Sequence, residues 1–443
     1  MRTTKICLLI ALAVSTAQVS ADTPPLDAGQ SDPLRMGWMQ GNPPPASKVI
    51  RVEDGSSWTF PQSRWAFAHF RELYPTAAVS RGRGPVTPLP VALRPDLAAI
   101  SITWPGQDQP VNWVEAFDAN YADAILVLHR GRIVFEKYNG VMTTDQPHIG
   151  FSVTKSLYGM LTEMLIAEGR IDERRTVASY IPELAQSGFA DATVRQVLDM
   201  TTSLDFNEDT DEGNRRFAAM LVADGLQPHA VDYAGPLTLF DALKTVRKVG
   251  AHGQRFDYQS VDTEILSLII ARVTGKPSHE ILSERIWSKL GADHDANIVV
   301  DRAGMPVALG GLSATLRDFA RFGEMMRRGG RFNGQQVVPA GVVARIRAGG
   351  NPADMTNALT DYKTRRGWSY RSQWWVRHNP HGAYMAIGSY GQGIYVDPVA
   401  EMVVVRFMSG PTVSSVGMDP MTHAAFDALA SKLMAPKGKS PQK

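Results

Sequence analysis

The chain has 443 residues, 44% of them hydrophobic and 20% charged, which is enough apolar material for a large buried core. Its formal net charge is +2, from 46 basic and 44 acidic residues, and it has no long Lys/Arg run. This composition excludes the electrostatic pattern of a nucleic-acid-binding protein. Cys7 is the single cysteine, so no disulfide framework and no paired cysteine ligands are available.

Residues 1–21 are predicted to form a secretory signal peptide. The basic segment MRTTK precedes an apolar run, ICLLIALAV, and small residues end at Ala21 before DTPP. The apolar run is shorter than a typical membrane-spanning helix, and an uncleaved N-terminal anchor is the alternative interpretation. Cleavage near Ala21 removes Cys7, Arg2 and Lys5, which leaves 44 of the 46 basic residues against 44 acidic ones. We therefore expect a nearly neutral mature protein that is secreted or periplasmic and has no membrane span.

The remaining chain is predicted to contain one domain with a lead-in and a tail. Residues 22–110 are rich in Pro and Gly and are expected to form an irregular lead-in packed on the domain, with a short helix from Trp65 to Leu73. The domain is expected to span residues 111–435. Residues 436–443 are expected to form a flexible tail.

The domain begins with a predicted β-hairpin, residues 124–138, in which Gly131 supplies a positive φ for the turn. Apolar residues at helical spacing then predict helices, and β-branched or aromatic runs predict strands. The expected helices are 153–168 (ended by Gly169), 193–200, 261–273, 316–327 and 422–433, and the expected strands are 374–378, 393–398 and 402–408. This order indicates an α+β (mixed α/β) fold, in which strands from both ends of the chain join one sheet and a helical lobe is inserted between them.

A candidate catalytic motif, Ser152-Val-Thr-Lys155, stands where an apolar segment becomes helical. Residues three apart lie on one helix face, so the lysine amine can reach the serine hydroxyl. Backbone N–H groups at the helix N-terminus can bind an oxyanion, and a buried lysine can act as a base because burial lowers its pKa. The alternative is an ordinary helix start with a solvated lysine. Ser440 to Lys443, in the tail, has the same spacing by chance.

Two further motifs favour the catalytic interpretation. Tyr258-Gln-Ser260 precedes a helix and can hold a phenol and a hydroxyl over the Ser/Lys pair, where the phenol can relay a proton. A core tyrosine followed by a helix-capping serine is the alternative. Gly388-Ser-Tyr-Gly-Gln-Gly393 would let a strand edge approach a substrate and present N–H groups to its carbonyl, although a β-bulge or turn would also explain these glycines.

The three motifs, in this order and with these flanks, resemble the serine β-lactamase and penicillin-binding-protein superfamily. Within it, the chain is similar to class C-like hydrolases of the carboxylesterase and 6-aminohexanoate-dimer hydrolase branch. The similarity runs from about Arg64 to Phe407 and includes the stretches that begin at Trp65, Asp199, Gly310, Ser372 and Tyr390. It implies a β-lactamase/transpeptidase-like domain over 111–435, with an antiparallel sheet flanked by helices.

The resemblance also implies roles for individual residues. Ser152 would be the acyl-forming nucleophile and Lys155 its base or electrostatic partner. Tyr258 would be the proton relay, and Ser260 would be a pocket hydroxyl. Backbone N–H groups of Ser152 and of Gln392 or a neighbour are the candidate oxyanion hole.

The third motif departs from the superfamily pattern. Ser389-Tyr390-Gly391 stands where Lys-Thr-Gly or His-x-Gly is common, and no Lys-Thr-Gly occurs in the sequence. This departure argues against a β-lactamase or peptidase activity, because that lysine helps to hold the substrate carboxylate. We therefore expect an exported serine hydrolase that cleaves small ester or amide bonds, without metal or cofactor. The alternatives are a penicillin-recognising D-amino peptidase or β-lactamase, and a non-catalytic binding or sensor module. No oligomeric state is indicated.

Overall fold

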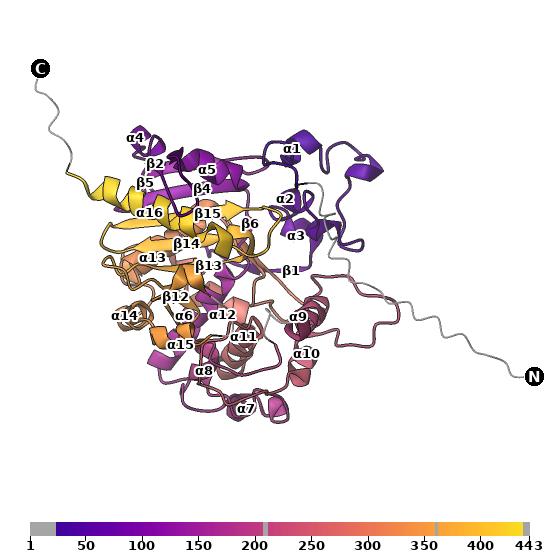
Figure 1. Cartoon of the computed structure of the whole chain (residues 1–443). Helices are drawn as coiled ribbons and strands as arrows, with labels where there is room; N and C mark the ends of the chain where they lie inside the picture. Colours follow the sequence, from indigo (N-terminus) through magenta and orange to yellow (C-terminus); the bar gives the residue numbers. More distant parts are fainter. Residues whose placement is uncertain (1–23, 207–210, 359–361, 437–443) are drawn as a thin grey trace, which may run out of the picture.

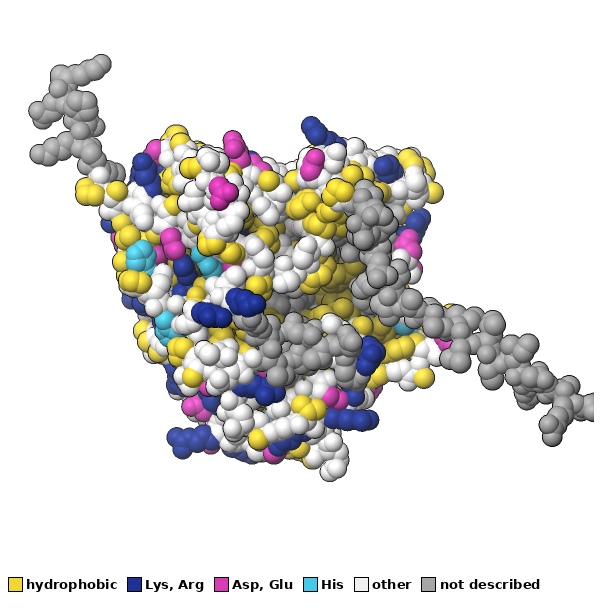
Figure 2. Space-filling view, viewed as in Figure 1, with side chains coloured by type: hydrophobic (Ala, Val, Ile, Leu, Met, Phe, Trp, Pro, Cys, Tyr) yellow, Lys and Arg dark blue, Asp and Glu magenta, His cyan; other side chains and the backbone are white. Residues whose placement is uncertain are grey.

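The computed structural model describes residues 24–206, 211–358 and 362–436. The predicted signal peptide, residues 207–210 and residues 437–443 of the predicted tail lie outside these residues. Within the described ranges, no helix combines the length and the apolar character needed to cross a membrane. Basic and acidic side chains are interspersed on the face shown in Figure 2.

The centre of the molecule is a seven-stranded antiparallel sheet (Figure 1). The strand order is β11 (Ser369–Arg371), β12 (Trp374–Val376), β13 (Tyr384–Ile387), β14 (Gly393–Asp397), β15 (Met402–Met408), β4 (Ala122–His129) and β5 (Arg132–Tyr138). Strand β15 pairs with β4, so strands from both ends of the domain are neighbours, as predicted.

Helices cover both faces of this sheet. Side chains alternate along a strand, so successive residues of β4 belong to different cores. Leu126 and Leu128 share one core with α6 (Val153–Ala167), α11 (Val261–Thr274) and α13 (Leu316–Arg327). Ile125 and Val127 share the other core with α5 (Trp113–Ala119) and α16 (Asp419–Met434). The fold is therefore the predicted mixture of helices and antiparallel sheet.

Most predicted elements are present, and several short elements were not predicted. The hairpin is β4–β5, and Gly131 has the expected positive φ of 74°. The helix expected from Trp65 to Leu73 is interrupted and forms α2 (Ser63–Ala66) and α3 (Phe70–Leu73). Strand β13 was not predicted, because its four residues have no apolar–polar alternation and are buried on both faces.

The lead-in adds a strand to a second sheet. This sheet is antiparallel and consists, in order, of β1 (Thr76–Val79), β7 (Ala296–Val299), β8 (Leu312–Ala314) and β6 (His148–Ile149). Strand β6 ends just before α6, so this sheet fixes the start of that helix. The lead-in and the start of the domain also contain α1 (Pro33–Met36), α4 (Pro95–Ala98), and a two-stranded sheet of β2 (Ser101–Ile102) and β3 (Val111–Asn112).

The inserted helical lobe lies below the main sheet in Figure 1. With α6 and α11 it contains α7 (Val177–Tyr180), α8 (Val194–Leu198), α9 (Asp211–Ala223), α10 (Leu239–Thr245) and α12 (Ser278–Arg285). A small hairpin of β9 (Arg331–Phe332) and β10 (Gln335–Gln336), then α14 (Ala340–Ala348) and α15 (Pro352–Thr356), return the chain to the sheet.

One buried turn joins the lobe to the sheet. Gln373, between β11 and β12, has Nε2 donating to the Leu198 carbonyl at 3.0 Å and Oε1 accepting from Thr263 Oγ1 at 2.9 Å. Its own carbonyl accepts from Ser156 Oγ at 2.6 Å. Gly159 lets α6 reach this turn, since a Cβ there would lie 2.1 Å from the Ser372 carbonyl oxygen. This contact fixes α6, α8 and α11 relative to one another.

Candidate active site

Ser152 and Lys155 lie at the N-terminus of α6 with their side chains in contact. Lys155 Nζ donates a hydrogen bond to Ser152 Oγ at 2.8 Å. The lysine is 1% exposed and also donates to the carbonyl of Leu309. Ser152 is partly exposed. The serine is thus accessible, whereas the amine beside it is shielded from water.

The residue before the serine has a strained backbone. Phe151 has a φ of 46°, a left-handed conformation that is unfavourable for a bulky side chain. Its ring packs on Phe67 at 4.9 Å, Tyr390 at 5.4 Å and Trp58 at 5.8 Å between centroids. This aromatic cluster, which includes two residues of the lead-in, holds the sharp turn that presents Ser152.

The structure brings the second motif to the same place. The Tyr258 ring centroid is 5.4 Å from Lys155 Nζ, and the ring stacks on Trp375 at 5.8 Å. Tyr258 is half-buried. Ser260 is buried and stands at the N-terminus of α11, where its side chain does not cap the helix. Tyr258 therefore lies next to the Ser/Lys pair, as predicted from the sequence.

The third motif approaches from the sheet. A Cβ at Gly388, just after β13, would lie 2.3 Å from the carbonyl oxygen of Gly150, so only glycine permits this contact. Ser389–Gly391 form a 3₁₀ turn in which Ser389 is partly exposed. Tyr390 packs into the aromatic cluster instead of facing a pocket, and its burial raises the pKa of the phenol to about 12.

The backbone N–H groups of Ser152 and Ser389 have no acceptor in the described part of the chain. The sequence interpretation preferred Gln392 or a neighbour. The Gln392 N–H donates to the Ser389 carbonyl at 3.4 Å, and its side-chain amide bonds to Met408 of β15. Gln392 therefore supports the turn, and the available N–H belongs to Ser389, three residues before it.

Sequence reasoning missed two buried acids near the lysine. Asp224, directly after α9, is fully buried, and neither carboxylate oxygen has a hydrogen-bond partner among the described residues. Burial and the charges of Glu264 and Asp301 raise its pKa, and Lys155 opposes that shift. Glu264, on α11, is also fully buried. An acid inside the otherwise apolar run that follows Ser260 was a usable signal for Glu264, because unpaired buried acids are rare.

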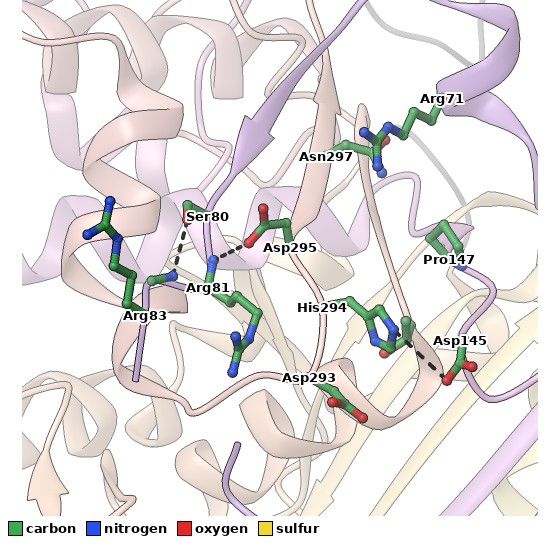
Figure 3. Close-up of a pocket in the computed structure, with 12 residues that line it drawn as sticks. Arg71, Ser80, Arg81, Arg83, Asp145, Pro147, Asp293, His294, Asp295 and Asn297 are labelled. Atoms are coloured by element: carbon green, nitrogen blue, oxygen red, sulfur yellow. Dashed lines mark hydrogen bonds and ion pairs between the residues drawn. The ribbon is translucent and has the colours of Figure 1, made fainter. Parts of the chain in front are cut away.

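A pocket of ≈ 640 Å³ lies elsewhere, beside the smaller sheet (Figure 3). None of the predicted site residues lines it. In it, the backbone N–H of Arg81 donates to Asp295 Oδ1 at 2.6 Å, and His294 Nε2 lies 3.9 Å from Asp145 Oδ1. No group of three or more His, Cys, Asp or Glu residues in the described ranges is arranged to hold a metal ion.

Comparison with known proteins agrees with this geometry. The beta-lactamase family model matches residues 112–426. The chain belongs to the beta-lactamase family. A 6-aminohexanoate-dimer hydrolase of Paenarthrobacter ureafaciens is 39% identical over 351 residues, which cover 79% of this chain and 86% of the relative. The protein is therefore a serine hydrolase of this family, as the sequence resemblance implied.

Solved structures of the family have the same fold. A Bacillus anthracis protein assigned to the 6-aminohexanoate-dimer hydrolases has a TM-score of 0.79 at 30% identity, over 89% of this chain and 100% of that one. A family VIII carboxylesterase has a TM-score of 0.54 at 18% identity, over 71% and 96% of the two chains. At that identity the carboxylesterase shows the shared fold alone.

Proposed function

We propose that this protein hydrolyses small linear amides, and esters of similar size, through an acyl-Ser152 intermediate. The observation that carries the proposal is the 2.8 Å contact between Lys155 Nζ and Ser152 Oγ, in which the amine is buried and the hydroxyl is accessible. An amine in this position can take the serine proton as the oxygen attacks a carbonyl.

The surrounding groups supply the rest of the reaction. The unpaired N–H groups of Ser152 and Ser389 would bind the oxyanion of the tetrahedral intermediate. Tyr258, beside Lys155, would pass a proton to the leaving amine or alcohol. Water would then attack the acyl-serine, and the same groups would return the proton to Ser152.

The amide preference follows from the Paenarthrobacter relative, whose name specifies a 6-aminohexanoate dimer, a linear amide with an ammonium and a carboxylate end. The test is incubation of the purified protein with this dimer and, separately, with a p-nitrophenyl ester, with product release measured for each. Covalent labelling by a fluorescent penicillin with no hydrolysis of either substrate would instead support a penicillin-recognising enzyme. An acyl adduct that never releases would support a binding or sensor module.

We also propose that the protein is exported. The support is the basic, apolar and small-residue pattern of residues 1–21. Expression of the full chain in a bacterial host is expected to yield a periplasmic or secreted form that begins near Asp22. Intact-mass measurement of that form checks the cleavage, and a full-length, membrane-bound product would contradict it.

A further inference from the structure

Glu264 is a fully buried carboxylic acid on the first turn of α11. Its Oε1 atom accepts a hydrogen bond from the Leu309 N–H at 2.7 Å. The carbonyl of the same residue, Leu309, accepts a hydrogen bond from Lys155 Nζ. Leu309 therefore connects the carboxyl group of α11 to the amine of α6, and the position of that amine depends on the position of Leu309.

The Glu264 carboxyl also interacts electrostatically with the Lys155 amine. Burial raises the pKa of Glu264 to about 8, while hydrogen bonds from the Leu309 and Ala308 N–H groups and the Lys155 charge oppose the rise. Glu264 Oε2 has no hydrogen-bond partner among the described residues. Burial therefore disfavours the charged form of this carboxyl, which loses its proton at a higher pH than an exposed glutamate does.

Other titratable groups face this pair. They are Tyr158 of α6, Tyr258 before α11, Asp224 after α9 and Asp301 after β7. Tyr158 belongs to α6 and Tyr258 precedes α11, the two helices that carry the pair. Asp224 follows another helix of the lobe, and Asp301 follows a strand of the second sheet. Leu309 itself bonds to the pair, with its N–H donating to Glu264 and its carbonyl accepting from Lys155.

We propose that Glu264 is a positioning residue for Lys155. It fixes Leu309, whose carbonyl holds the lysine amine against Ser152, and it places a titratable charge beside that amine. The inference rests on the proposed Ser152/Lys155 mechanism. Lys155 must lose its proton to act as a base, and a negative neighbour opposes that loss. The hydrogen bond and the charge are separable, because an amide can accept the Leu309 N–H without ever ionising.

Two variants separate these effects, and a third is the matched control. Glu264→Gln keeps an acceptor for Leu309 and removes the charge, whereas Glu264→Leu removes both. Asp262→Asn changes another fully buried acid on the same turn of α11, whose carboxylate accepts from Thr202 instead of the Leu309 segment. For each, kcat and KM for a p-nitrophenyl ester and the rate of fluorophosphonate labelling are measured across the pH range, with Ser152→Ala in the same series.

In the plots of kcat/KM and of labelling rate against pH, the rise with pH is expected to move to lower pH by about half a unit or more in Glu264→Gln. KM is expected to be unchanged. In Glu264→Leu, kcat is expected to be about tenfold to a hundredfold lower at every pH, because Lys155 is misplaced. Asp262→Asn is expected to follow the wild-type profile.

A Glu264→Gln profile that superimposes on the wild type, or a Glu264→Leu variant with wild-type kcat, overturns the inference while Ser152-dependent labelling persists. A wild-type reaction that survives Ser152→Ala is a different outcome. It overturns the proposed mechanism, and the inference about Glu264 falls with it.

Discussion

Replacing Ser152 with alanine is expected to lower kcat/KM for p-nitrophenyl esters by about 10⁴-fold or more. The variant lacks the oxygen that forms the acyl intermediate and that accepts the hydrogen bond from Lys155 Nζ at 2.8 Å. KM for a bound ester should change little. Intact-mass spectrometry should show one fluorophosphonate adduct on the wild type, mapped to the peptide that contains Ser152, and none on the variant.

Thr162→Val is the matched control for this experiment. Thr162 is buried on α6, and its hydroxyl donates to the Tyr158 carbonyl at 2.9 Å. It lies ten residues from Ser152, about 15 Å along the helix. This variant should keep activity within about twofold of the wild type, because it changes helix packing but not the reacting groups. Activity above about 1% in pure Ser152→Ala would refute the nucleophile assignment.

Replacing Lys155 with methionine is expected to lower kcat about 10³-fold. Methionine fills much of the same volume but cannot accept the Ser152 proton or donate to the Leu309 carbonyl. The loss should appear in kcat more than in KM, because the amine touches the serine and not the bound substrate. Steady-state kinetics over a range of pH, with labelling rates for the same samples, measure it.

The pH dependence separates a catalytic lysine from a structural one. The wild-type rate should rise with pH as Lys155 loses its proton, and this rise should be absent from Lys155→Met. Thermal unfolding provides the folding control, since a buried methionine in place of an amine should leave the protein folded. A folded variant that keeps more than about a tenth of the wild-type kcat would show that Lys155 is not the base.

The parts of the fold that the sequence predicted are those with a local physical cause. Helix 316–327 has an unbroken apolar stripe, and its observed bounds match the prediction. Gly131 and Gly169 were identified as turn and helix-end residues, and both have a positive φ. Strand β13 was missed because a short strand buried on both faces carries no alternation, so only its neighbours define it.

In the candidate site, too, one part follows from the local sequence and another part depends on the tertiary structure. The spacing of Ser152 and Lys155 within one helical turn is a local property, and the sequence alone determined that the two side chains share a helix face. The adjacency of Tyr258 to that pair, and of Gly388 to Gly150, depends on how α11 and β13 pack on α6. Those contacts join residues more than 100 positions apart, so the sequence supported them only through resemblance.

The surroundings of Lys155 were decided only by the tertiary structure. Glu264 and Asp224 are ordinary acids in the sequence, and no local pattern places them beside the lysine. Their burial follows from the closure of the helical lobe against the sheet, which removes water and thereby makes each charge depend on its neighbours. The sequence determined which chemical groups are present and in what order along the chain. The packed structure determined which of them share one low-dielectric environment and act on one another.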